Sequence, residues 1–169
     1  MNTTLNIKLR PAVAEDEDFL VAVYGSTREQ ELAMVPWTAE QKEAFVRSQL
    51  TAQLRHYQTE YPNAEYSIIL FEDQPVGRLY VDRRATEVRI MDITLLPAFR
   101  GKGISSPLIR RLKDEASAVA KELSINLDKL SLSQSHLVFE RLGFKAVDPV
   151  DDDKSFHILY VWQPVAIST

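Results

Sequence analysis

A short glycine-containing turn is the part of this sequence best suited to chemistry. Residues 100–106 read Arg-Gly-Lys-Gly-Ile-Ser-Ser and lie between an apolar stretch typical of a buried strand and a pattern typical of a helix. The first amides of a helix lack intrahelical partners and carry the positive end of the helix dipole, so they attract anions. Glycines let the backbone approach a ligand closely, and Arg100 and Lys102 add positive charge. The segment therefore predicts a site for a pyrophosphate group.

Two familiar phosphate-binding motifs do not fit this turn. A P-loop requires a glycine five positions before Gly101, where this chain has Leu96, and a Ser or Thr after Lys102, where it has Gly103. A dinucleotide-binding fingerprint requires a third glycine at the position of Ser106. The residues therefore disfavour both kinds of nucleotide-binding enzyme.

A third motif does fit, and others accompany it along the chain. Residues 100–105 resemble the Arg/Gln-x-x-Gly-x-Gly/Ala motif of the GNAT superfamily of N-acetyltransferases, and residues 93–97 (Ile-Thr-Leu-Leu-Pro) resemble its pantetheine-contacting strand. Residues 138–144 (Val-Phe-Glu-Arg-Leu-Gly-Phe) are similar to the late helix of that family. Residues 9–12 and 75–77 look like its opening strand and the start of its third strand. The resemblance thus covers nearly the whole chain in the right order.

Acetyl-CoA is the cosubstrate that the resemblance implies, without a metal. It would lie in an opening between strand residues 88–96 and 124–128, where an amide near Leu95 could polarise the thioester carbonyl. The primary amine of a small molecule or peptide would attack that carbonyl directly. The residues that the resemblance assigns to acetyl-CoA are Ile93, Thr94, Leu95, Arg100, Gly101, Lys102, Gly103, Ile104, Ser105, Ser106 and Phe139.

The residues that would move protons depart from the family pattern. Many relatives have a tyrosine at the position of Phe139 as the acid for the leaving thiolate, and phenylalanine cannot donate a proton. Ser133 and His136 are candidate replacements, although a surface role for His136 is the ordinary alternative. Asp92 is the candidate base, and a carboxylate that only shapes the strand end is the equal alternative. The rival function is therefore a non-catalytic sensor or interaction domain that binds acyl-CoA.

The elements expected to position these residues form an α/β domain of the α+β type. Strands are predicted at residues 5–9, 66–71, 76–81, 88–96, 124–128, 144–147 and 156–162. Helices are predicted at about residues 15–25, at 38–61 behind a capping box, after the phosphate turn with Ser106 as N-cap, and at 133–142. The predicted domain is a single GNAT-like one spanning residues 1–169, with a central mixed, mostly antiparallel sheet flanked by helices.

Composition narrows the classes further. The chain has 169 residues, 45% of them hydrophobic and 26% charged, which is typical of one folded domain. It has no cysteine, which excludes a disulfide scaffold and a cysteine nucleophile. Its 20 basic and 24 acidic residues argue against a nucleic-acid partner and mildly favour a cationic acceptor. We expect no membrane span and no signal peptide, hence a cytoplasmic location, and leave pairing of two copies open.

Overall fold

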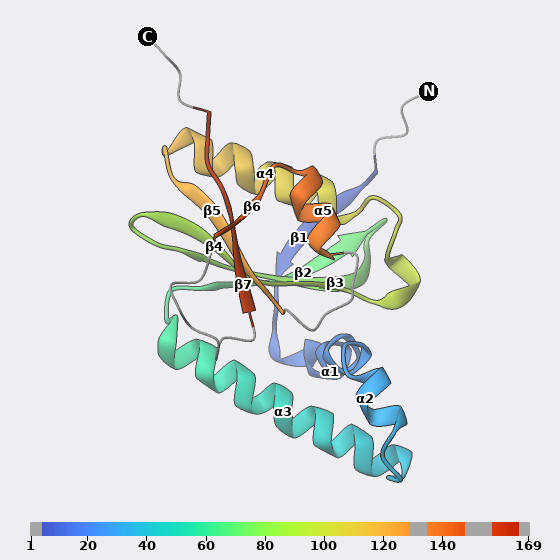
Figure 1. Cartoon of the computed structure of the whole chain (residues 1–169). Helices are drawn as coiled ribbons and strands as arrows, with labels where there is room; N and C mark the ends of the chain where they lie inside the picture. The colour runs from blue at the N-terminus through green and yellow to red at the C-terminus, as the bar shows by residue number, and fades with distance from the viewer. Residues whose placement is uncertain (1–4, 129–134, 148–156, 166–169) are drawn as a thin grey trace. The chain divides into compact units, whose positions relative to one another are not determined.

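The fold is described by a computed structural model for residues 5–128, 135–147 and 157–165 (Figure 1). In this part of the chain the strands are β1 (Ile7–Pro11), β2 (Glu65–Phe71), β3 (Gln74–Arg83), β4 (Glu87–Leu95), β5 (Glu122–Asp128), β6 (Lys145–Val147) and β7 (His157–Trp162). The α-helices are α1 (Glu17–Ser26), α2 (Glu29–Ala33), α3 (Ala39–Glu60), α4 (Ser105–Ala118) and α5 (Ser135–Arg141). This order confirms the predicted one, with α2 as an addition.

The strands form one mixed sheet in the order β1-β2-β3-β4-β5-β7-β6. Strands β4 and β5 are parallel, whereas β1 with β2, β5 with β7, and β6 with β7 are antiparallel. The first strand begins two residues later than predicted and includes Pro11, which pairs with Ser67. Because β1 lies at the edge of the sheet, a proline without an N–H is tolerated there.

The start of α4 differs from the sequence-based expectation. The helix begins at Ser105, so Ser106 is not its N-cap and Pro107 is its third residue instead of its first. The proline remains compatible with the helix, because amides of the first turn have no intrahelical partner. Val119 follows the last residue of the helix and is exposed.

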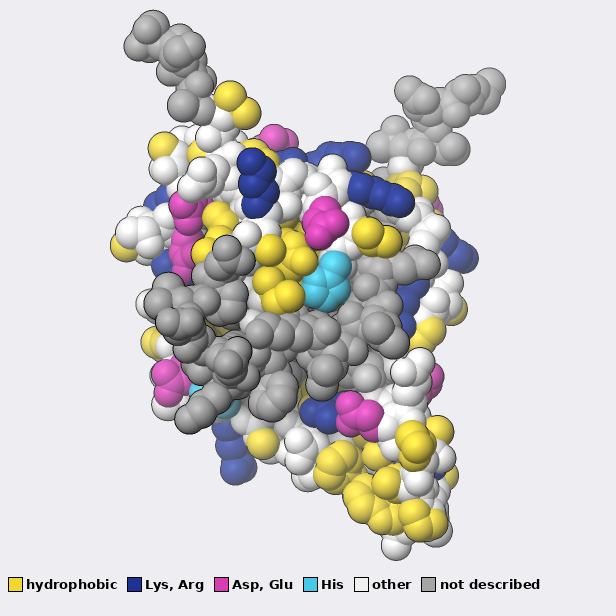
Figure 2. Space-filling view, viewed as in Figure 1, with side chains coloured by type: hydrophobic (Ala, Val, Ile, Leu, Met, Phe, Trp, Pro, Cys, Tyr) yellow, Lys and Arg dark blue, Asp and Glu magenta, His cyan; other side chains and the backbone are white. Residues whose placement is uncertain are grey.

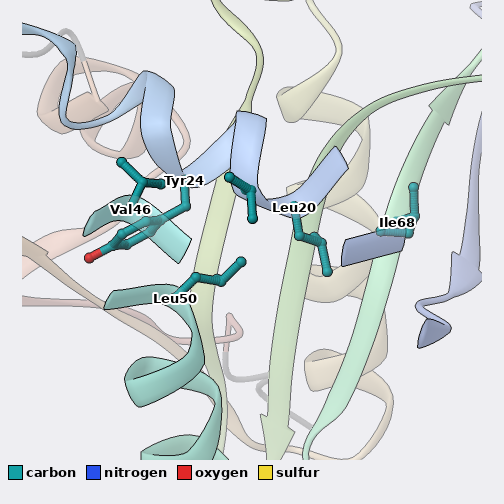
Figure 3. Packing of buried hydrophobic residues seen from close by; sticks show 6 residues of the cluster. Leu20, Tyr24, Val46, Leu50 and Ile68 are labelled. Atoms are coloured by element: carbon teal, nitrogen blue, oxygen red, sulfur yellow. The ribbon is translucent and has the colours of Figure 1, made fainter. Parts of the chain in front are cut away.

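Packing divides the chain into two units, residues 1–80 with 93–104 and residues 81–92 with 105–169. In the first unit, α1 and α3 pack together against β2 (Figure 3). Leu20 and Tyr24 of α1 meet Val46 and Leu50 of α3, and Ile68 contributes from the strand. These side chains follow the helical spacing that the sequence predicts, so the apolar face of each helix is the buried one.

In the second unit, α4 packs against β5 through the apolar face formed by Leu108, Ile109, Leu112 and Ala116. Lys113 of the same helix donates from Nζ to the carbonyl oxygen of Leu142 at 2.7 Å. This bond ties α4 to the residue that follows α5. Among the described residues, no helix is long and apolar enough to cross a membrane.

Candidate active site

The end of β4 is held by an unusually close approach of β3. The amide of Leu96 donates to the carbonyl oxygen of Val76 at 2.9 Å. A Cβ atom on Gly77 would lie only 2.3 Å from the oxygen of Thr94 and 3.0 Å from the Cα of Leu95. Only glycine can therefore occupy position 77 without moving this backbone, and Thr94 and Leu95 are two of the three strand residues assigned to acetyl-CoA.

The register of the parallel strands is consistent with the expected opening. The pairing of β4 with β5 runs from Glu87↔Glu122 to Ile90↔Ile125, although both strands continue beyond these residues. The pairing of β5 with β7 continues to Asp128↔His157. The last residues of β5 thus have their described partners on β7, as expected if β4 and β5 diverge after Ile90. Asp92, the candidate base, follows two residues later in β4 and is half-buried.

The glycine turn leaves its backbone open. Gly101 and Gly103 have φ angles of +73° and +76°, which residues other than glycine rarely adopt. Nothing lies within 4 Å of the position that a Cβ would take at either residue. Ile104 is buried and anchors the end of the turn, and the chain passes directly into α4 at Ser105. An exposed, positive-φ turn before a helix fits an anionic group such as a pyrophosphate.

Arg100 has a contact that the sequence does not reveal. Its Nε donates to the carbonyl oxygen of Leu95 at 3.0 Å, and its Nη2 donates to Oγ of Ser26 at 3.4 Å. The side chain therefore ties the end of β4 to the last residue of α1. Lys102 lies with its Nζ 5.6 Å from the ring centroid of Phe99 and is exposed, which leaves it accessible to an anion.

On α5, Phe139 is buried and packs edge-on against Phe144, with ring centroids 5.1 Å apart. One turn earlier, Nδ1 of His136 lies 3.0 Å from Oη of Tyr160 on β7. Burial, and to a smaller degree the charge of Glu140, raises the pKa of Tyr160. The structure thus pairs His136 with a phenol 24 residues away, a contact for which the sequence carries no local signal. Ser133 lies outside the described residues.

Glu87, at the start of β4, is engaged in a polar network. Burial alone would raise its pKa, but a hydrogen bond from Ser124 and the charges of Arg89 and Arg84 outweigh burial, so the pKa is lowered. The hydroxyl of Ser124 donates to Oε2 of Glu87 at 2.9 Å and accepts from Nε of Arg89 at 2.7 Å. A carboxylate held ionised in this way is a structural group and a poor proton acceptor.

Two aromatic residues, Trp37 and Tyr61, flank α3 at its opposite ends. The ring of Trp37 packs edge-on against Phe45 at 5.3 Å, whereas Tyr61 lies 6.3 Å from Tyr57. The 22 residues of the helix span about 33 Å at 1.5 Å per residue. Trp37 and Tyr61 therefore cannot both line the pocket of one small amine. Across the described residues, no cluster of His, Asp or Glu side chains could hold a metal ion.

Comparison with known proteins identifies the family. The family model of the acetyltransferase (GNAT) domain matches residues 27–159. Sequence comparison with curated proteins finds no match. The fold is similar to that of the PaiA N-acetyltransferase from Thermoplasma acidophilum in complex with coenzyme A, with a TM-score of 0.64, 15% identity, and coverage of 94% of this chain and 99% of that chain.

Two further solved structures give the same result. The RimL ribosomal L7/L12 α-N-protein acetyltransferase in complex with coenzyme A has a TM-score of 0.64 at 16% identity, with 96% of each chain covered. An acetyltransferase from Thermus thermophilus has a TM-score of 0.63 at 17% identity, covering 93% of this chain and 96% of that one. At these identities the structures are alike in fold, and together with the family match they show that this chain belongs to the GNAT acetyltransferase family.

Proposed function

We propose that the protein is an acetyl-CoA-dependent N-acetyltransferase that acts on a primary amine of a small molecule or peptide. The observation that carries the proposal is the open, positive-φ turn at Gly101 and Gly103, which follows the strand end held by Gly77. The amides of residues 101–106 and the charge of Lys102 would hold the phosphates, and the backbone of residues 93–95 would hold the pantetheine arm. When bound, acetyl-CoA supplies an acetyl thioester and a thiolate leaving group.

Arg100 acts in this proposal mainly through its contact with Leu95. Its guanidinium occupies the carbonyl oxygen of Leu95 and so fixes the last peptide groups of β4. An amide near that point would then face the thioester oxygen without reorganisation, which is where oxyanion-type stabilisation has its effect. Arg100 is thus a positioning residue as well as a source of positive charge near the phosphates.

Proton handling falls to three residues of the second unit in this proposal, Asp92, Tyr160 and His136. Asp92 would take the proton of the amine, directly or through a water molecule. Tyr160 would donate a proton to the thiolate in place of the missing tyrosine at position 139, and His136, 3.0 Å away, would reprotonate it. An ordinary tyrosine is already protonated at neutral pH, and the raised pKa of Tyr160 extends that state to higher pH. We expect Tyr160→Phe to slow single-turnover thiol release about 10²-fold, with unchanged affinity for acetyl-CoA. An unchanged rate would remove Tyr160 from the mechanism.

The decisive test of the function is release of free thiol from acetyl-CoA in the presence of a panel of amines. We expect amine-dependent release by the wild type and a large loss in Gly103→Val, whose side chain would enter the open turn and strain its backbone. Calorimetry with acetyl-CoA on the same proteins separates binding from turnover.

The alternative is a non-catalytic domain that binds acyl-CoA. This alternative is favoured by Phe139, which is buried and cannot donate a proton. Tight binding of acetyl-CoA without amine-dependent thiol release for any amine would support this alternative and refute the enzyme. Absence of acetyl-CoA binding would refute both functions.

A further inference from the structure

The side chain of Arg100 joins separate segments of the first unit. Its backbone enters the glycine turn, its Nε donates to the carbonyl oxygen of Leu95 at 3.0 Å, and its Nη2 donates to Oγ of Ser26 at 3.4 Å. Ser26 is the last residue of α1 and lies 74 residues from Arg100 in the chain. The guanidinium is planar and its donors point in fixed directions. One rigid group therefore connects the end of α1 with the end of β4.

The hydroxyl of Ser26 is oriented by its own helix to accept this bond. It donates its only proton to the carbonyl oxygen of Val23 at 2.6 Å, so its lone pairs remain for Arg100. A hydroxyl that already donates one hydrogen bond accepts another more strongly, because the two bonds polarise each other. The carboxyl end of a helix also carries the negative end of its dipole, which favours a guanidinium there.

Packing gives less support to the chain beyond the end of α1. Tyr24 is buried, whereas the following helix, α2, has no buried residue. Met34 and Trp37, which come after α2, are exposed, and hydrophobic side chains gather at the surface around these helices (Figure 2). The bond from Arg100 to Ser26 therefore acts at the point where burial of α1 gives way to an exposed segment.

From these contacts we infer that Ser26 is a positioning residue for acetyl transfer, which acts through Arg100 to hold the last peptide groups of β4. The inference rests on the proposed N-acetyltransferase function, in which an amide near Leu95 faces the thioester oxygen. Ser26 touches neither the cosubstrate nor the amine in this role. Its loss should therefore disturb the geometry of the reacting groups and leave the binding of both substrates nearly unchanged.

Thr27 provides the matched control. Its Oγ1 donates to the carbonyl oxygen of Tyr24 at 2.6 Å, a bond of the same length and spacing as that from Ser26 to Val23. Of these two neighbouring hydroxyls, it is that of Ser26 that accepts from Arg100. Ser26→Ala and Thr27→Val each remove one hydroxyl from the end of α1, but only Ser26→Ala removes a contact with Arg100.

The first measurement is hydrogen exchange of the protein without acetyl-CoA. The amides of Leu96, Phe99 and Arg100 donate to backbone carbonyls at 2.9 to 3.3 Å, so their exchange reports how firmly the end of β4 and the start of the turn are held. We expect Ser26→Ala to speed their exchange about threefold to tenfold, as for the loss of one hydrogen bond. Thr27→Val should exchange as the wild type does, and so should Ser26→Thr, which keeps the hydroxyl.

The second measurement is thiol release from acetyl-CoA with the amine that the wild type acetylates fastest. Ser26→Ala should lower kcat about threefold to tenfold with unchanged KM for both substrates, because the lost contact acts on the transition state. Thr27→Val should keep the wild-type kcat. Arg100→Lys keeps the positive charge but loses the fork of the guanidinium. In the Arg100→Lys protein, Ser26→Ala should have no further effect, as expected when two residues act through one contact.

The inference is overturned if Ser26→Ala and Thr27→Val exchange alike, or if Ser26→Ala acetylates the amine as fast as the wild type does. An additional loss of kcat when Ser26→Ala is combined with Arg100→Lys would also overturn it, because Ser26 would then act by another route. Each of these results leaves the proposed function intact. If the wild type acetylates no amine, the proposed function is refuted and a role in acetyl transfer falls with it, whereas faster exchange in Ser26→Ala would still show that Ser26 holds the end of β4.

Discussion

Replacing Gly77 with alanine tests how closely β3 must approach the end of β4. The added Cβ would lie 2.3 Å from the carbonyl oxygen of Thr94 and 2.9 Å from Cδ2 of Leu95. Carbon and oxygen atoms in close strand contacts are usually about 3.3 to 3.6 Å apart, so the backbones must separate by about 1 Å. The atom in the way belongs to the backbone, so no side chain can simply rotate away.

Overpacking of this kind typically costs about 1–3 kcal/mol. For a chain of this length each kcal/mol lowers Tm by about 2–4 °C, so we expect Gly77→Ala to melt at least about 2 °C below the wild type. A displacement of about 1 Å at the reacting centre can cost about 10²-fold in rate. The folded fraction of Gly77→Ala should therefore bind acetyl-CoA more weakly and release thiol about 100-fold more slowly.

Gly25 provides the matched control. A Cβ there would lie 3.4 Å from Cγ1 of Val46, an ordinary contact, and the residue is within α1. Gly25→Ala should keep or raise Tm, because alanine favours a helix by up to about 1 kcal/mol over glycine. Thermal unfolding followed by calorimetry with acetyl-CoA on both variants makes the comparison. A wild-type Tm for Gly77→Ala would refute the close approach. A lowered Tm with wild-type affinity and turnover would refute the assignment of Thr94 and Leu95 to the cosubstrate.

Three further changes give separate expectations. Asp16 is buried and accepts two hydrogen bonds of 2.8 Å from Arg10, and these bonds lower the pKa of Asp16. Asp16→Asn should therefore lower the free energy of unfolding by about 1–3 kcal/mol at pH 7, as measured by denaturant unfolding. A lowered pKa stabilises the fold only above the ordinary pKa of about 3.9. The difference in the free energy of unfolding between Asp16→Asn and the wild type should therefore shrink below about pH 4. A difference that stays constant with pH would contradict the ion pair. The fully buried hydroxyl of Ser124 donates to Glu87, so Ser124→Ala should lower the free energy of unfolding by about 1–3 kcal/mol. An unchanged Tm would show that the network around Glu87 rearranges without this hydrogen bond. Asp92→Asn should lower turnover with unchanged affinity for acetyl-CoA, and an unaltered pH–rate profile would leave Asp92 a structural carboxylate.

Features determined by neighbouring residues could be read from the sequence alone. The capping box is one, with Oγ1 of Thr38 3.1 Å from the amide of Gln41 and the side chain of Gln41 2.9 Å from the amide of Thr38. The glycine turn is another, because positive φ angles at Gly101 and Gly103 follow from the residue type. The strand and helix order followed in the same way, since hydrophobic periodicity is set by which face of each element is buried. The boundaries were less certain, as the start of α4 at Ser105 shows.

Contacts between distant segments were decided only by the tertiary structure. Nothing near Arg100 indicates that its guanidinium turns back to the carbonyl of Leu95, and nothing near His136 indicates a bond to Tyr160. The same holds for the approach of Gly77 to Thr94, which depends on how two strands pack. Local hydrogen bonds and backbone preferences act within a few residues, so the sequence specifies them directly. Long-range contacts depend on the simultaneous packing of all elements, and only the folded chain brings those atoms together.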